Sequence, residues 1–234
     1  MLRTILFYAR YLPLTAALTL LAICVPSAAK WCARTWGRAA IHCTGITLDV
    51  RLGDLDPNQT YIFMANHQSQ LDIPALTTAL APWQIGFVAK KGLFNIPLFG
   101  KAMINAGNIP IDRGNRRSAM KSVDKAAERV RAGQSIVIFP EGTRATDLSC
   151  LQEFKIGGMI IALKTGLPVV PVTISGSGEA LPKHNLCFGP QRTITIRALP
   201  PISTQGRYTL KEREIFKEDL YRAMSAAYTE QLNG

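Results

Sequence analysis

The seven residues from Asn66 to Asp72 bring an imidazole and a carboxylate together directly after an apolar run. The run at 61–65 is typical of a short buried strand, so His67 falls where an α/β protein usually carries its chemistry. His67 and Asp72 are five residues apart, and on a continuous helix this spacing would point them away from each other. A turn between them would let Asp72 hold one ring nitrogen and leave the other as a base. The segment therefore predicts a histidine general base that is oriented by an aspartate.

Ser69, Asp72 and Pro74 follow one another in the order expected at the start of a helix: a hydroxyl cap, then an acid and a proline in the first turn. We expect a helix from about residue 72, with Ser69 as its cap and His67 in the preceding loop. In the alternative interpretation, Asp72 is only a capping residue and His67 is a loop histidine bonded to backbone. The pair alone does not decide between the two interpretations.

A second polar segment, from Phe139 to Arg144, ends another apolar run in the same way. Glu141 and Arg144 lie here in a turn that contains glycine. A carboxylate beside a guanidinium suits a substrate that carries hydroxyl groups and a phosphate. Taken alone, the two residues could equally form a surface ion pair.

Two further segments complete the pattern. Residues 107–113 form a short apolar strand that ends on Arg113, and residues 168–174 form a β-branched strand bracketed by prolines. The second of these is typical of a core strand.

The four segments, in this order, resemble the blocks of the glycerolipid acyltransferase family. The family's Asn-His-x-Ser-x-x-Asp block is matched by Asn66, His67, Ser69 and Asp72. Its Gly-x-Ile-x-Ile-x-Arg block is matched by Gly107, Ile109, Ile111 and Arg113, and its Phe-Pro-Glu-Gly-Thr-Arg block by residues 139–144 without a change. The later blocks appear at residues 154–157 and 168–172. The ordered set covers residues 60–175, and it is the order that makes the resemblance specific.

The resemblance implies a reaction and a set of site residues. The best-known members transfer a fatty acyl group from an acyl thioester, acyl-CoA or acyl carrier protein, to the free sn-2 hydroxyl of 1-acylglycerol-3-phosphate, which gives phosphatidic acid. His67 and Asp72 would be catalytic, and the acceptor hydroxyl would itself be the nucleophile. The expected substrate-binding residues are Asn66, Ser69, Gly107, Arg113, Glu141, Gly142, Thr143, Arg144 and Lys155. Neither a bound cofactor nor a metal site is expected.

Three other functions compete with this one. The nearest is an acyltransferase that acts on another lysophospholipid or on a lyso-aminolipid. A lipid hydrolase would need an activated nucleophile, yet Ser175 and Ser177 lack the glycines of a Gly-x-Ser-x-Gly elbow. A non-catalytic membrane-binding protein would be favoured only if His67 and Asp72 proved dispensable.

Composition favours an anionic membrane surface as a partner. The formal net charge is +11 over 234 residues, and anionic lipids together with the phosphates of coenzyme A would account for it. Nucleic acid is not expected, because the chain shows no zinc spacing, aromatic RNA-binding motif or helix-turn-helix pattern. The five cysteines are scattered and odd in number, which is typical of reduced thiols in the cytosol. We expect the active site to face the cytoplasm, at the inner membrane of a bacterium.

Residues 1–43 differ from the rest of the chain. Nineteen uncharged residues separate Arg10 from Lys30, and as a helix they would span roughly 28 Å against a hydrocarbon core of about 30 Å. Pro13 and Pro26 interrupt the ends of this run, and basic residues with tryptophans follow it in an interfacial pattern. The resemblance implies two helices embedded in one leaflet, which we favour over one true span or a helix buried in the protein core.

Residues 44–234 should form the catalytic α/β domain, a mixed, largely parallel sheet flanked by helices. We expect strands near 46–52, 61–65, 85–89, 108–111, 135–139, 168–174 and 193–198. Helices are expected near 72–80, 97–105, 115–132, 153–165 and 209–231.

Overall fold

The protein is built around one mostly parallel sheet, shown by a computed structural model that describes residues 2–112 and 116–233, with 116–120 described by their backbone alone. The strands of the described residues are β1 (Thr47–Arg51), β2 (Ile62–Ala65), β3 (Ile85–Lys90), β4 (Ile109–Ile111), β5 (Ser135–Ile138), β6 (Val169–Ser175) and β7 (Thr193–Ala198). Their order in the sheet is β1-β7-β6-β2-β5-β3-β4. Strands β6, β2, β5, β3 and β4 run parallel, whereas β7 is antiparallel to β6.

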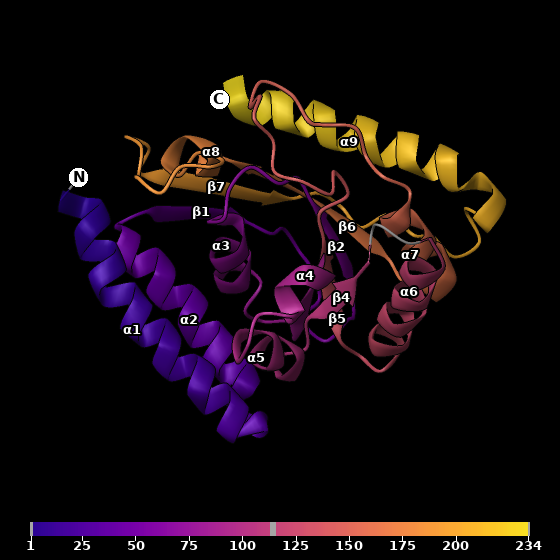
Figure 1. The fold of residues 1–234 in the computed structure, drawn as a ribbon. Helices are drawn as coiled ribbons and strands as arrows, with labels where there is room; N and C mark the ends of the chain where they lie inside the picture. Colours follow the sequence, from indigo (N-terminus) through magenta and orange to yellow (C-terminus); the bar gives the residue numbers. More distant parts are fainter. Residues whose placement is uncertain (1, 113–115, 234) are drawn as a thin grey trace.

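Helices cover both faces of this sheet (Figure 1). They are α1 (Leu2–Cys24), α2 (Ala29–Thr44), α3 (Asp72–Ala79), α4 (Lys91–Phe94), α5 (Phe99–Asn105), α6 (Arg116–Arg131), α7 (Gly157–Thr165), α8 (Ser177–Ala180) and α9 (Arg213–Asn233). Successive residues of β2 point to opposite faces, so Phe63 joins a core with α2 and α3, whereas Met64 joins a core with α6, α7 and α9. Both faces of β2 are buried, as expected for a central parallel strand.

The expected mixed α/β fold is confirmed, and the strands lie within one residue of the expected ranges. The helices differ more. The helix expected from residue 153 begins only at Gly157, and the helix expected from residue 209 begins at Arg213 after a 3₁₀ turn (Leu210–Glu212). Two short helices, α4 and α8, were not expected from the sequence.

The N-terminal segment forms a pair of antiparallel helices joined by a 3₁₀ turn, η1 (Pro26–Ala28) (Figure 1). Pro13 lies inside α1, so the expectation that it would interrupt the apolar run is wrong. By length and composition α1 could cross a membrane, and it is largely exposed. By contrast, α2 packs closely on α3, because a side chain at Gly37 would lie 2.8 Å from Thr77.

Candidate active site

The candidate site lies where parallel strands end at one edge of the sheet. Strand β2 ends at Ala65, one residue before the Asn66–Asp72 loop, and β5 ends at Ile138, just before the Phe139–Arg144 turn. These two strands are direct neighbours in parallel register. The two polar segments predicted from the sequence therefore lie side by side, with His67 after the end of β2 and Phe139 after the end of β5.

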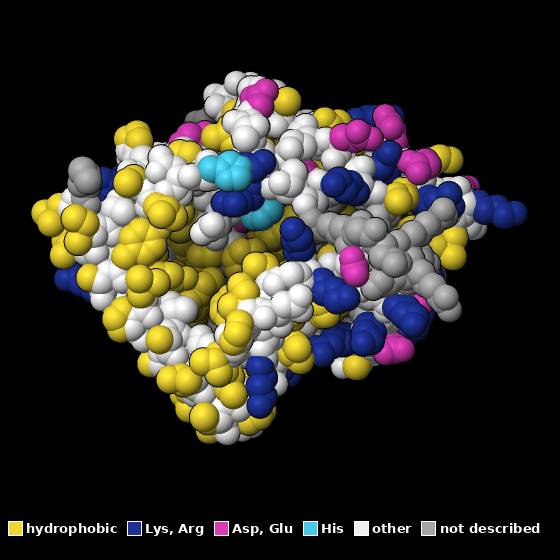
Figure 2. All heavy atoms as spheres, viewed as in Figure 1, with side chains coloured by type: hydrophobic (Ala, Val, Ile, Leu, Met, Phe, Trp, Pro, Cys, Tyr) yellow, Lys and Arg dark blue, Asp and Glu magenta, His cyan; other side chains and the backbone are white. Residues whose placement is uncertain are grey.

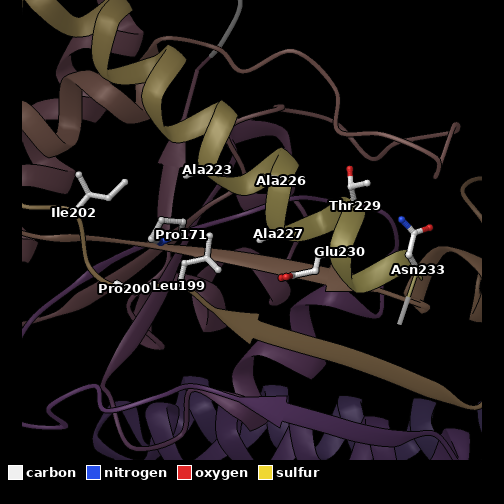
Figure 3. A pocket seen from close by; sticks show the side chains of 10 residues that line it. All are labelled: Pro171, Leu199, Pro200, Ile202, Ala223, Ala226, Ala227, Thr229, Glu230 and Asn233. Carbon is white, nitrogen blue, oxygen red and sulfur yellow. The ribbon is translucent and has the colours of Figure 1, made fainter.

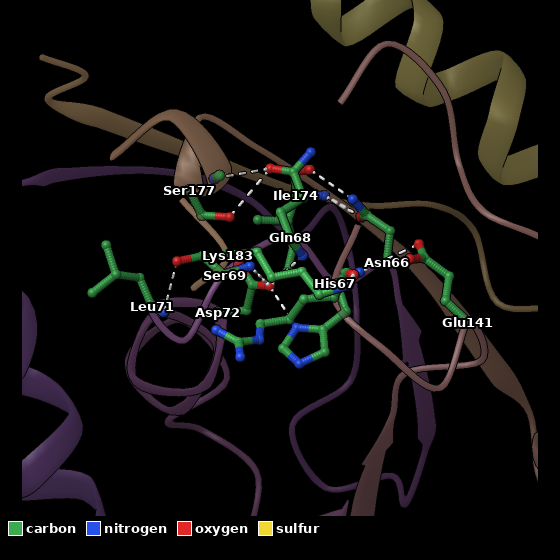
Figure 4. Close-up of polar contacts among 12 residues, drawn as sticks. Asn66, His67, Gln68, Ser69, Leu71, Asp72, Glu141, Ile174, Ser177 and Lys183 are labelled. Atoms are coloured by element: carbon green, nitrogen blue, oxygen red, sulfur yellow. Dashed lines mark hydrogen bonds and ion pairs between the residues drawn. The ribbon is translucent and has the colours of Figure 1, made fainter. Parts of the chain in front are cut away.

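His67 and Asp72 meet across a tight turn (Figure 4). Nδ1 of His67 lies 2.7 Å from Oδ2 of Asp72. The same carboxylate oxygen accepts the backbone N–H groups of Gln68 at 2.7 Å and of Ser69 at 2.9 Å. Because Asp72 is fully buried, these three contacts hold the loop and the ring in one arrangement.

Ser69 does not cap the helix as the sequence suggested. Leu71 occupies the N-cap of α3, and the Ser69 hydroxyl donates to the carbonyl of Leu181 while accepting the N–H of Leu71. No side chain of the described residues caps α3; the Asp72 carboxylate instead reaches back to the amides of Gln68 and Ser69 in the preceding loop. The local order serine, acid, proline therefore predicted the helix start correctly, but the predicted cap by Ser69 is wrong.

Phe139 packs against the imidazole ring of His67 and holds its plane. Its side chain stacks on the imidazole of His67 with ring centroids 4.0 Å apart and an interplanar angle of 15°. Nδ1 is engaged by Asp72, so Nε2 is the ring nitrogen left to act on a substrate.

Glu141 joins the two segments. One carboxylate oxygen accepts the backbone N–H of His67 at 3.3 Å, and the other accepts the side-chain N–H of Gln152 at 2.7 Å. Burial raises the pKa of Glu141 to about 7, although both hydrogen bonds oppose the shift. This carboxylate therefore acts within the protein as a brace between loops and titrates near neutral pH.

Contacts with distant parts of the chain, which the motif alone does not reveal, hold the side chains of Asn66 and Gln68. The amide of Asn66 donates to the carbonyl of Ile174 and accepts its N–H, so it ties the end of β2 to β6. Gln68 donates to the hydroxyl of Tyr228 on α9 at 2.5 Å, and Tyr228 donates to the carbonyl of Leu148 at 2.6 Å. Asn66, Ser69 and Gln68 are all buried and shape the loop. Sequence reasoning missed Gln68 and Tyr228, since no local signal links residues 160 positions apart.

The other expected binding residues are not all gathered at this edge. Thr143, Arg144 and Lys155 lie at or near the turn after β5, and the carbonyl of Arg144 accepts a hydrogen bond from Lys183. Gly142 has a φ of +75°, and a side chain there would press on Lys155. Gly107 precedes β4 and therefore lies at the opposite edge of the sheet, where its carbonyl accepts the Gln134 side chain. Arg113 lies outside the described residues.

Two cavities and one hollow surround these elements. A cavity of about 470 Å³ is lined by residues of the turn after β5 and by Lys217 of α9, and Glu141 separates it from the His67 loop. A larger one of about 600 Å³ lies between α9 and the residues beside Pro171 (Figure 3) and does not include the His67 loop. Figure 2 shows a hollow lined by hydrophobic side chains between the α1–α2 pair and α3 to α5, with histidine and basic groups at its rim.

Within the described residues, no group of three or more histidine, cysteine, aspartate or glutamate side chains is arranged to hold a metal ion. The side chains of Asn66, Ser69 and Glu141 are bound to other groups of the protein, whereas Oδ1 of the buried Asp72 has no hydrogen-bond partner in the part of the chain that the structure describes.

Comparison with known proteins identifies the class of protein that this fold and site define. The acyltransferase family model matches residues 48–175, so the chain belongs to the acyltransferase family. It is 38% identical over 151 residues to the chloroplastic 1-acyl-sn-glycerol-3-phosphate acyltransferase BAT2 of Brassica napus, which covers 64% of this chain and 43% of that protein. It is 32% identical over 154 residues to the 1-acyl-sn-glycerol-3-phosphate acyltransferase of Escherichia coli, covering 64% of this chain and 61% of that one.

A solved structure resembles the whole chain. The crystal structure of the 1-acyl-sn-glycerophosphate (LPA) acyltransferase PlsC from Thermotoga maritima aligns with a TM-score of 0.77 and 26% identity, covering 100% of this chain and 95% of that chain. The chain spans less than half the length of the first curated relatives that it matches. Since the PlsC alignment includes α1 and α2, the N-terminal helix pair is part of the shared fold.

Proposed function

We propose that this protein acylates the sn-2 hydroxyl of 1-acylglycerol-3-phosphate with a fatty acyl group from an acyl thioester, which yields phosphatidic acid. The 2.7 Å contact between His67 Nδ1 and Asp72 Oδ2 carries the proposal. The names of the relatives support the acceptor, and either acyl-CoA or acyl carrier protein would serve as the donor. The protein would act at a membrane to which α1 attaches it, with the site on the cytoplasmic side.

The reaction needs one base and no covalent enzyme intermediate. An ionised Asp72 can only accept a hydrogen bond, so the proton of the neutral imidazole stays on Nδ1 and the lone pair of Nε2 is free. Nε2 takes the proton of the acceptor hydroxyl as its oxygen attacks the thioester carbonyl. The tetrahedral intermediate then expels the thiolate, which takes the same proton from the imidazolium. A C–O bond forms, a C–S bond breaks, and the histidine returns to its starting state.

Several residues of the motif blocks suit the two substrates. Arg144, and Arg113 after β4, are proposed to bind the acceptor phosphate, because guanidinium groups pair with phosphate oxygens by two parallel hydrogen bonds. Gly142, two residues before Arg144, lies beside the Lys155 side chain, and both are proposed to help to hold the same phosphate. The apolar hollow of Figure 2 offers space for acyl chains beside a histidine.

The test is an acyl-transfer assay on purified full-length protein with both donors and a panel of lysolipids. We expect 1-acylglycerol-3-phosphate to react faster than lysophosphatidylethanolamine or a lyso-aminolipid at subsaturating concentration. His67→Ala should lower turnover by roughly a hundredfold to ten-thousandfold, whereas the matched control His42→Ala, an exposed histidine at the end of α2, should leave it unchanged.

Other outcomes would identify the rival functions. Equal rates on phosphomonoester and phosphodiester acceptors would indicate a broader lysolipid acyltransferase. Release of free fatty acid without an acylated product would indicate a hydrolase. Near-normal turnover of His67→Ala would refute the proposed base.

A further inference from the structure

The segment from Lys91 to Asn105, here called the α4–α5 hairpin, exposes large apolar side chains that no part of the proposed chemistry uses. The exposed fractions are 41% for Leu93, 47% for Ile96, 58% for Leu98 and 46% for Ile104. Isolated exposed apolar residues are common on soluble proteins, but four within twelve consecutive residues form a patch that calls for a partner.

Two backbone features of the hairpin hold the apolar side chains at the surface. Leu98 has a φ of +64°, a conformation that residues other than glycine, asparagine and aspartate rarely adopt. Gly100 lets the two short helices close on each other, because a side chain there would lie 2.0 Å from the carbonyl oxygen of Phe94. Strained positions persist where the surrounding structure enforces them, and they concentrate at functional surfaces. The projecting leucine at Leu98 is such a position.

The hairpin continues the exposed apolar face of α1. Asn105 donates to the carbonyl of Ala22 in α1 at 2.9 Å. Ala102 and Ala106 pack against a buried cluster of residues from α1 and α2: Leu18, Ala22, Ala29 and Cys32. Figure 1 shows α5 beside the η1 end of the helix pair, and Figure 2 shows hydrophobic side chains over both elements. The two apolar surfaces thus belong to one side of the molecule.

The charges of these two regions have a single sign. All sixteen acidic residues of the chain lie in 49–72 and 112–230, so the stretches 1–48 and 73–111 contain none. The same two stretches carry eight lysines and arginines: Arg3, Arg10, Lys30, Arg34, Arg38, Lys90, Lys91 and Lys101. Asp112, just beyond the second stretch, pairs with Lys91 at 3.3 Å. The other cations lie beside apolar side chains, and this combination complements a bilayer with anionic headgroups.

We propose that the α4–α5 hairpin is a second membrane-inserting element, which enters an anionic lipid surface beside α1. Leu93, Ile96 and Leu98 insert among the acyl chains, and Lys90 and Lys101 contact the headgroups. The hairpin lies across the apolar hollow from α1, so both sides of the hollow meet the bilayer. The proposal rests on the membrane attachment stated under Proposed function.

Vesicle flotation of the full-length protein tests this without any need for turnover. The probe is a vesicle of phosphatidylethanolamine and phosphatidylglycerol. Leu93→Glu/Ile96→Glu should lower the partition coefficient by at least about tenfold, because two aliphatic side chains lose their burial in lipid. The matched control Leu210→Glu/Ile215→Glu changes two residues that are similarly exposed, 45% and 56%, near the start of α9, and it should bind as the wild type does.

A second variant separates charge from apolar insertion. Lys90→Gln/Lys101→Gln should bind several-fold more weakly to the anionic vesicles and equally well to pure phosphatidylcholine. Circular dichroism of each variant in detergent confirms that the fold is kept, since all four substituted positions are exposed.

The outcomes are distinguishable. If the wild type does not float, membrane attachment itself is wrong. If the wild type floats and Leu93→Glu/Ile96→Glu floats equally well, or falls no more than the α9 control, the hairpin proposal is overturned. If the wild type is a dimer in detergent and this variant is a monomer that still floats, the patch binds a second copy of the chain and the proposal also fails.

Discussion

At the scale of single residues, we propose that the site combines groups that act on a substrate with groups that hold the loop. Arg144 belongs to the first kind in our proposal. A phosphomonoester carries nearly two negative charges and three free oxygens, which a guanidinium fork can bind in pairs. Arg144→Ala should raise the apparent KM for the acceptor or abolish turnover, with little change in the KM for the acyl donor. Arg144→Lys should not fully restore the acceptor KM, because a point charge does not reproduce the fork. An increase confined to the donor KM would argue against this role.

Glu141 should make stability depend on pH. Its pKa is raised by burial from 4.5 to about 7, so the folded state binds the proton more tightly than the unfolded state does. The resulting stabilisation is complete below about pH 4.5 and is lost as the pH rises through about 7. The apparent Tm of the wild type should therefore fall relative to that of Glu141→Gln between pH 5 and pH 8.

The exposed carboxylate of Glu153, from the same segment, provides the control. Glu153→Gln should follow the wild-type Tm across this range. A constant Tm difference between wild type and Glu141→Gln at every pH would show that Glu141 does not titrate there.

At the scale of elements, the C-terminal helix reaches the His67 loop. Tyr228 of α9 accepts a hydrogen bond from Gln68 and donates one to the carbonyl of Leu148, so it connects α9 with the His67 loop and with the chain that follows Arg144. Burial raises the pKa of Tyr228 above its ordinary value, which keeps the hydroxyl protonated as a donor. Tyr228→Phe should lower kcat by about tenfold with little change in either KM, because a loop held less firmly orients His67 less often.

Tyr221 is the matched control on the same helix. Its hydroxyl donates to the carbonyl of Leu151 at 3.1 Å. Tyr221→Phe also removes one hydroxyl, at a cost of about 1 kcal/mol in stability, and it should leave kcat within about twofold of wild type. Equal losses of kcat in the two variants would mean that α9 acts through stability alone.

At the scale of the whole molecule, the N-terminal helices have different tasks. Ile41 of α2 belongs to the core that Phe63 shares, and Arg34 donates to the carbonyl of Trp83. Deleting residues 1–40 should therefore expose the core and cause aggregation. Replacing the exposed Leu2, Ile5, Leu6 and Leu12 of α1 by glutamine should instead weaken membrane attachment and preserve the fold.

Sedimentation with membranes and thermal unfolding in detergent measure the two effects separately. A high-salt wash should not strip the wild type, because salt screens charges and leaves apolar burial intact. Quantitative release by salt would count against insertion of α1. A soluble, cooperatively folding 41–234 fragment would show that α2 is dispensable for the core.

The sequence by itself determined the elements that have strong local signals. The strands around Phe63 and Val137, the loop with His67 and Asp72, and the glycine turn at Gly142 all follow from apolar runs that end in polar residues. The contact between His67 and Asp72 was predictable because it is local: a five-residue separation with a helix start beyond it leaves few ways for a turn to close.

The tertiary structure alone decided which of these residues are buried and bonded to distant parts of the chain. Asn66 and Ser69 stand in the motif beside His67, yet both are buried and bonded to distant carbonyls, those of Ile174 and Leu181. Gly107, from another motif block, precedes β4 and therefore lies at the amino ends of the parallel strands, opposite the His67 loop. The reason is that strand order and the packing of helices onto the sheet depend on pairings between residues far apart in the chain. Local spacing carries no record of those pairings.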